Sequence, residues 1–226
     1  HFRVGANGRA EGYDDKYYFG RRPNGVYIPR FANVPGDTKK RDFIRGFGYQ
    51  GEARRINNAP TGVIGSALKE VIFTPGAYSL RMTCFGEMLP YHENKVTLDT
   101  SKKDKWGLPV LAIDCEIKDN EHKMRKDMMN DAKEMLEAAG AKNVSTYDAG
   151  YAPGMGIHEM GTARMGRDPK TSVLNGNNQV WDALNVFVTD GACMTSAAAV
   201  NPSLTYMALT ARAADYAFNE LKKQNL

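Results

Sequence analysis

The most restrictive feature of this sequence is a stripe of apolar residues between Asn120 and Ala139. The stripe recurs at intervals of three and four residues, which is the spacing along one face of an α-helix. Its members are Met124, Met128, Ala132, Met135 and Ala139. Asp119 is placed to cap the N-terminus and Gly140 to end the helix. We interpret the stripe as a packing face, not a cofactor site, so a second layer has to cover it.

Segments with the character of strands precede this helix. Residues 78–87, 95–98 and 108–117 are joined by short polar connections, which favours an antiparallel sheet. Residues 1–60 lack a helical period and are predicted as short strands and long loops, and a short helix is predicted around 66–71. The predicted fold class is α/β, or α+β, with a mainly antiparallel sheet backed by helices.

The C-terminal third combines loops, one strand and one helix. Residues 150–166 are rich in glycine and give little signal for regular structure, whereas 183–189 form an apolar run of strand length. The last helix is predicted from Asn201 as N-cap and Pro202 at the first helical position to about Leu221. Its helical spacing links Leu204, Ala208, Ala211, Asp215 and Phe218.

Charge and cysteine content exclude some classes of protein. The net charge of +4 is too small to indicate nucleic-acid binding. The three cysteines form no CxxC motif, so neither a metal site nor a redox motif is predicted, and buried thiols are favoured over disulfides. No apolar run approaches the ~20 residues that span a bilayer. The densest basic stretch, Lys39–Arg55, is interpreted as solvated surface, with an anionic partner or substrate as the alternative.

His158 is the candidate catalytic residue. None of the four histidines pairs with another His or Cys at metal-ligand spacing, and Thr162 breaks the HExxH pattern that His158 begins. Glycines before His158 let the backbone pass close to a flat ligand, and a neutral imidazole can accept a proton. A histidine held by loop hydrogen bonds remains the alternative. The glycines at 154 and 156 do not form a dinucleotide fingerprint.

Two more positions could contact a ligand. Asp190 and Gly191 follow the apolar run at 183–189, where they could approach a ligand or form only a turn. Asn201 is placed as a helix cap, and the start of the helix behind it carries partial positive charge.

The segment from His158 to Asp215 resembles the C-terminal region of the glucose–methanol–choline (GMC) oxidoreductases. The resemblance is carried by four blocks in the same order: HEMGTARMG from His158, NVFVTDG from Asn185, NPSLT from Asn201 and ALTARAAD from Ala208. Upstream, the segments EMLP, NKVTLD and WGLP resemble the substrate domain of the family more loosely.

This resemblance implies FAD as cofactor. It places His158 over the flavin ring as the base for a substrate hydroxyl, with Asn201 hydrogen-bonding the same oxygen. It also implies that the FAD is lined by Asp190, Gly191, Asn201, Pro202 and Thr205. The helix that opens at Asn201 would stabilise negative charge on the pyrimidine side of the reduced ring.

The resemblance further implies two domains and a missing part. Residues 1–165 would form the substrate-binding domain, and 166–226 would supply the last strand and helix of the FAD-binding domain. The N-terminal Rossmann part of the family is absent from this sequence, and the chain begins without Met or a signal pattern. We therefore expect a piece of a longer protein that is inactive until that FAD-binding portion is supplied.

Three functions remain open. The favoured one is oxidation of a CH–OH group of a sugar or glycoside, because the Tyr, Asn and Arg of residues 1–60 suit polyhydroxylated ligands. The second is the same chemistry on choline or a simple alcohol, although the many arginines disfavour a cationic substrate. The third is a non-catalytic carbohydrate-binding or assembly module. The electron acceptor, oxidase or dehydrogenase character and the compartment, periplasmic or cytoplasmic, stay undetermined.

Overall fold

The structure is a computed structural model that describes residues 2–12, 25–55, 61–74 and 76–226. The chain divides into two compact units. One unit contains Arg3–Gly86 and His122–Gly150, and the other contains Phe2, Glu87–Glu121 and Tyr151–Leu226.

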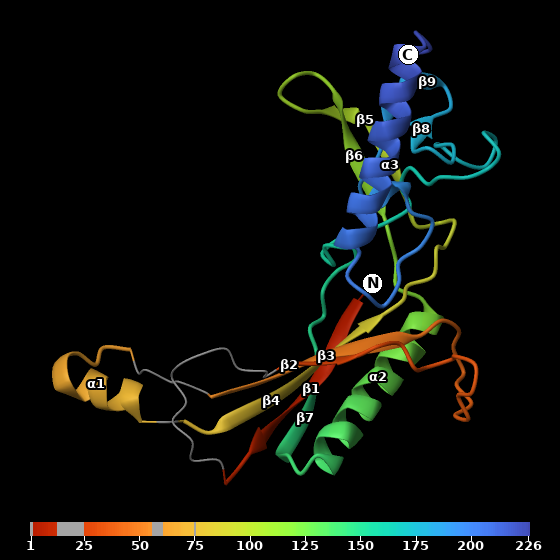
Figure 1. The fold of residues 1–226 in the computed structure, drawn as a ribbon. Helices are drawn as coiled ribbons and strands as arrows, with labels where there is room; N and C mark the ends of the chain where they lie inside the picture. The colour runs from red at the N-terminus through yellow and green to blue at the C-terminus, as the bar shows by residue number, and fades with distance from the viewer. Residues whose placement is uncertain (1, 13–24, 56–60, 75) are drawn as a thin grey trace. The chain divides into compact units, whose positions relative to one another are not determined.

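The first unit is built on a five-stranded sheet with the order β2-β3-β4-β1-β7 (Figure 1). The neighbours β2–β3, β3–β4 and β1–β7 are antiparallel, as the sequence predicts. The strand bounds are β1 Phe2–Ala10, β2 Gly25–Ile28, β3 Phe47–Arg55, β4 Tyr78–Gly86 and β7 Lys142–Asp148. The short helix α1, Gly65–Phe73, lies where a helix was predicted.

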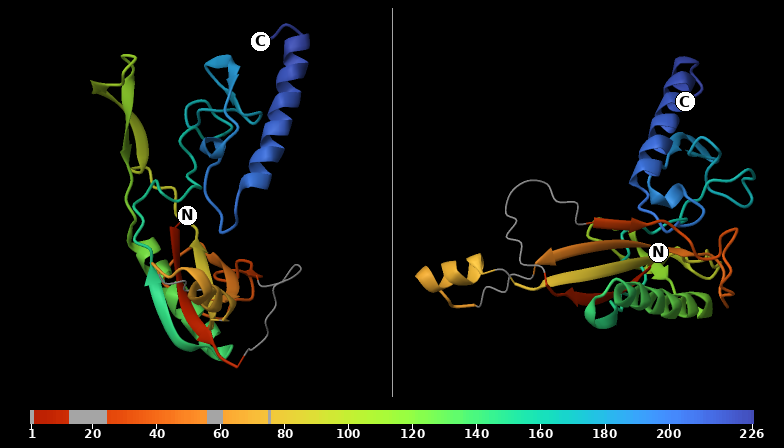
Figure 2. Two further views of the ribbon diagram at one scale, coloured as in Figure 1. Left: turned by 90° about the vertical axis from the view of Figure 1, so that its left-hand side faces the viewer. Right: turned by 60° about the horizontal axis from the view of Figure 1, so that its bottom comes forward.

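Helix α2, Asp119–Ala138, covers one face of this sheet (Figures 1 and 2). The predicted methionine stripe is the packing face over Met124, Met128 and Ala132, which are fully buried, whereas Met135 is half-buried and Ala139 is exposed. The hydroxyl of Tyr49 donates to the Met128 carbonyl over 3.2 Å, which ties β3 to the helix. Asp119 opens the helix instead of capping it, one residue from the prediction, and Gly140 ends it with a φ of 86°.

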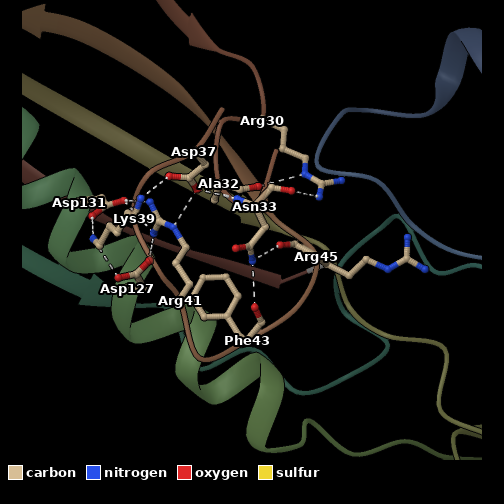
Figure 3. Close-up of polar contacts among 10 residues, drawn as sticks. All are labelled: Arg30, Ala32, Asn33, Asp37, Lys39, Arg41, Phe43, Arg45, Asp127 and Asp131. Atoms are coloured by element: carbon tan, nitrogen blue, oxygen red, sulfur yellow. Dashed lines mark hydrogen bonds and ion pairs between the residues drawn. The ribbon is translucent and has the colours of Figure 1, made fainter. Parts of the chain in front are cut away.

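A charged network fastens the loop that follows β2 to α2 (Figure 3). The guanidinium of Arg41 pairs with Asp127 and Asp131 of the helix and with Asp37 of the loop. The Arg41 side chain is only 3% exposed. The prediction that Lys39–Arg55 is simply solvated surface is therefore wrong at Arg41, because acidic residues of a helix distant in the sequence enclose it.

The second unit contains a β-hairpin that the sequence assigned to the main sheet. Strands β5, Lys95–Lys103, and β6, Pro109–Asp114, pair only with each other as an antiparallel two-stranded sheet. The carboxylate of Asp104 accepts the backbone N–H groups of Trp106 and Leu108 at 2.9 Å each, which closes the turn locally. The strand prediction is confirmed, and the hairpin geometry explains why the two strands form their own sheet.

The remaining elements of the second unit come from the C-terminal third. They are β8, Gln179–Val180, β9, Ala183–Phe187, the 3₁₀ turn η1, Gly191–Cys193, and α3, Ser203–Lys222. Cys84 and Cys193 are buried free thiols, as predicted, whereas Cys115 is partly exposed. In the described ranges, no helix combines the length and the apolar character that crossing a bilayer requires.

Candidate active site

His158 lies, half-buried, in a turn that runs from Gly156 to Glu159. The backbone N–H of Gly156 donates to the Glu159 carboxylate over 2.6 Å, so a side chain closes the turn. Ile157, directly before His158, has a φ of 60°. A β-branched residue is strained in this left-handed region, so the turn adopts an unusual conformation at the histidine.

The segment after His158 runs along the turn η1. The N–H of Gly161 donates to the Gly191 carbonyl over 3.3 Å, and that of Ala163 donates to the Ala192 carbonyl over 3.0 Å. The N–H of Met165 donates to the Cys193 carbonyl over 2.9 Å. These contacts join two of the predicted site segments, which lie about thirty residues apart in the sequence.

Gly191 is the point where three segments meet. A Cβ atom at this position would lie 2.5 Å from the carbonyl oxygen of Glu159 and 2.8 Å from the hydroxyl of Tyr206 on α3. Both distances are far below van der Waals contact, so only glycine allows the Glu159 backbone and the Tyr206 side chain to pack this closely against the chain at this position. Burial raises the pKa of Tyr206, and nearby acidic groups, Asp190 and Glu159 among them, raise it further.

Asp190 forms a turn, which is one of the two roles that the sequence leaves open for it. Its Oδ1 accepts the backbone N–H of Ala192 at 2.9 Å and caps η1. The side chain remains exposed, so a contact with a ligand stays a prediction.

Helix α3 begins one residue later than predicted. Pro202 is the N-cap and makes no side-chain cap hydrogen bond, whereas Asn201 precedes the helix and is exposed. Thr205 is also exposed, in the first turn. The first N–H groups of this 20-residue helix therefore have no side-chain acceptor from the cap, and such donors suit an electron-rich ligand. This donor chemistry fits the pyrimidine side of a flavin.

A buried asparagine behind the site was missed by the sequence reasoning. Asn178 is fully buried with a φ of 65°, and its amide donates to the Val188 carbonyl over 3.0 Å. Its oxygen accepts from Arg212 of α3 at 2.9 Å. This contact fastens α3 to the end of β9. The Asn-Gly-Asn-Asn run from Asn175 signals a turn, but nothing in it signals burial.

The site holds no group typical of a metal centre. Within the part of the chain that the structure describes, no three His, Cys, Asp or Glu side chains come together as possible metal ligands.

Comparison with known proteins identifies the family. The family model described as GMC oxidoreductase matches residues 90–210, more than half of the chain and all six predicted site residues. The chain is 38% identical over 217 residues to 2-methyl-1,2-propanediol dehydrogenase of Mycolicibacterium austroafricanum, covering 92% of this chain and 38% of that protein. It is 32% identical to paromamine 6'-oxidase of Streptomyces fradiae, over 70% of this chain and 30% of the relative.

The fructose dehydrogenase large subunit of Gluconobacter japonicus is 27% identical, over 83% of this chain and 35% of its own length. The chain thus spans 30–38% of the length of these curated relatives. The family match includes both the His158 turn and the start of α3, the two ends of the site described above. The chain belongs to the GMC oxidoreductase family.

Proposed function

We propose that this chain is the C-terminal catalytic portion of an FAD-dependent oxidoreductase that oxidises a CH–OH group to a carbonyl. GMC oxidoreductases are generally flavin-dependent. The observation that carries the proposal is the convergence at Gly191, where the His158 segment, the Asp190 turn and the first turns of α3 pack together. These three segments contain every residue that the resemblance assigns to catalysis or to the cofactor.

His158 acts as the base. A ring nitrogen of its imidazole accepts the proton of the substrate hydroxyl. Asn201 hydrogen-bonds the same oxygen and orients it. A bound FAD would take the hydride from the carbon that carries this oxygen. The overall loss of one proton and one hydride leaves the carbonyl product.

The cofactor would be held by residues on both sides of Gly191. Asp190, Gly191, Asn201, Pro202 and Thr205 line it in this proposal. Asp190 and Thr205 are exposed, and the first turn of α3 has no side-chain cap. These polar groups, and backbone donors at the start of α3 that no side-chain cap occupies, support a contact with the heteroatoms of a flavin.

The substrate class has two candidates. A sugar or glycoside is supported by relatives named for paromamine and fructose. A simple alcohol is supported by the relative named for 2-methyl-1,2-propanediol, which has the highest identity and coverage of the three. The presence of both His158 and Asn201 argues against the non-catalytic carbohydrate-binding or assembly module.

The test uses the full-length flavoprotein that contains this chain. It is mixed anaerobically with glucosides, free sugars, choline and simple alcohols including vicinal diols, and the loss of visible flavin absorbance is followed. We expect one class to reduce the flavin, and His158→Ala to slow that reduction by about 10²–10⁴-fold, the usual contribution of a general base.

His122→Ala is the matched control, because His122 is exposed on α2. Its rate should equal that of the wild type. A His158→Ala variant that reduces flavin as fast as the wild type would overturn the assignment of the base. A full-length protein that carries no flavin would favour the binding module.

A further inference from the structure

A side chain of the turn around His158 closes that turn. His158 and Ile157 are its two central residues, and the Glu159 carboxylate closes it on the N–H of Gly156 at 2.6 Å. The acceptor is a carboxylate, so the hydrogen bond is charge-assisted. Since residues 156–159 are consecutive, the direction of the His158 side chain depends on how this bond holds the turn.

Ile157 makes the closed turn costly by itself. Its φ of 60° is unfavourable for a β-branched residue, and the residue is 81% exposed. An exposed isoleucine gains little packing energy to offset this strain. Without the Glu159 bond, the segment would relax toward conformations with negative φ at Ile157, and His158 would turn with it.

The main chain of Glu159 is fixed from the other side. Its carbonyl lies against Gly191, so close that a Cβ there would be 2.5 Å away. The N–H of Gly161 holds the same region to the Gly191 carbonyl. Glu159 is therefore anchored by its backbone to the Gly191 turn and by its side chain to Gly156, with His158 between the two anchors.

We infer that Glu159 is a positioning residue, whose carboxylate holds the strained turn that aims the imidazole of His158 at the substrate. The inference rests on the proposed function of His158. Glu159 itself exchanges no proton with the substrate. What it supplies is a hydrogen-bond acceptor at a fixed point, and the negative charge strengthens that bond.

The test is steady-state kinetics of four variants of the full-length flavoprotein with its best substrate. Glu159→Ala removes the acceptor and should lower kcat by about 10–100-fold, which is the loss of rate expected when a catalytic group is misplaced. KM should be nearly unchanged. Glu159→Gln keeps an amide oxygen in place and should restore kcat to within about threefold of the wild type, since a neutral acceptor makes a weaker bond than a charged one. Glu134→Ala, an exposed glutamate on α2, is the matched control and should match the wild type.

The decisive variant is Glu159→Ala combined with Ile157→Gly. Glycine adopts a φ of 60° without strain, so it should repopulate the turn and recover part of the lost kcat. A role in folding alone predicts no such recovery. Flavin content and melting temperature are measured for each variant, so that loss of the fold is seen directly.

The outcomes separate this inference from the proposed function. If His158→Ala is inactive while Glu159→Ala has the kcat of the wild type, the positioning role is wrong and the catalytic assignment stands. The positioning role is also wrong if Glu159→Gln has a kcat as low as that of Glu159→Ala and if adding Ile157→Gly to Glu159→Ala recovers none of the lost kcat. If His158→Ala is fully active, the proposed function fails first.

Discussion

At Gly191, the absence of a Cβ atom allows the segments of the site to pack together. The sequence places this glycine at a strand end and leaves open whether it forms a turn or approaches a ligand. In the structure it has an ordinary backbone conformation, and its role is to admit the Glu159 carbonyl and the Tyr206 hydroxyl into the space of a side chain. That requirement depends on two partners distant in the sequence, so no local pattern could predict it.

Gly191→Ala should therefore destabilise the protein and impair the site. Forcing a methyl group into a well-packed contact usually costs about 1–3 kcal/mol, and here the displaced atoms include backbone of the His158 turn. Thermal unfolding should show a lower melting temperature, and flavin reduction by the best substrate should be slower.

Gly176→Ala is the control for this change. A Cβ at Gly176 would meet no atom within 4 Å, and this glycine is not among those with positive φ. Equal stability of the two variants would show that the close approach at Gly191 does not exist in solution.

At the scale of elements, the loop after β2 depends on a helix that lies about ninety residues later. Arg41 is held by three aspartates, and its guanidinium lies 5.3 Å from the centre of the Phe47 ring. Lys39 adds a second cation at 2.7 Å from Asp131 (Figure 3). Backbone N–H groups of Asn33 and Lys39, with Arg41 nearby, hold the pKa of Asp37 below its usual value. The loop is thus part of the α2 layer and not a free surface segment.

Arg41→Met should lower stability by about 3–5 kcal/mol, because it leaves partly buried aspartates facing one another without their main cation. The measurement is chemical denaturation of the wild type and the variant at neutral pH. Lys40→Met, on the same loop but exposed, serves as control and should change stability by less than about 0.5 kcal/mol. A small effect at Arg41 would mean that the network does not form as described.

Helix α3 shows what periodicity could and could not predict. Its spacing revealed the helix through Leu204, Ala208, Ala211, Asp215 and Phe218, yet all five are exposed in the structure. The face that packs within its unit carries Tyr206 and Ala213, and Tyr216 meets Phe187 of β9 at 6.3 Å between ring centroids. The helix therefore has two apolar faces, and the stripe alone cannot tell which one meets the elements present here.

At the scale of the whole molecule, the local elements were predictable and their grouping was not. The α2 stripe, the 78–87 strand and the hairpin strands each carry their own pattern of side chains, which the structure confirms. Which strands share a sheet depends on contacts made over long sequence separations, so β5 and β6 were assigned to the wrong sheet. For the site, the blocks shared with the family predict the residues, whereas the burial of Asn178 and the close approach of the Glu159 carbonyl to Gly191 depend on contacts over long sequence separations. The functional division at residue 165 remains a prediction, since the compact units are defined by geometry alone.

Exposed apolar surface supports the proposal that residues 166–226 complete a larger FAD-binding domain. Leu204 and Met207 on α3 are 79% and 68% exposed, and Leu184 on β9 is 55% exposed. The chain spans 38% and 30% of the length of two curated relatives. A helix that is apolar on opposite faces is typical of a protein interior.

The double variant Leu204→Ser/Met207→Ser tests this cover in the full-length flavoprotein. If the side chains are buried there, each substitution forfeits about 1.5–3 kcal/mol of apolar burial, and the protein should lose stability and retain less flavin after purification. Lys126→Ser/Glu134→Ser, an exposed polar pair on α2, is the control for the loss of helix propensity and should change neither property. In residues 1–226 produced alone, the Leu204/Met207 pair should instead be neutral for stability and reduce the binding of a hydrophobic dye. Neutrality in the full-length protein as well would mean that this face of α3 stays in water, and the proposed place of residues 166–226 in the FAD-binding domain would have to be abandoned.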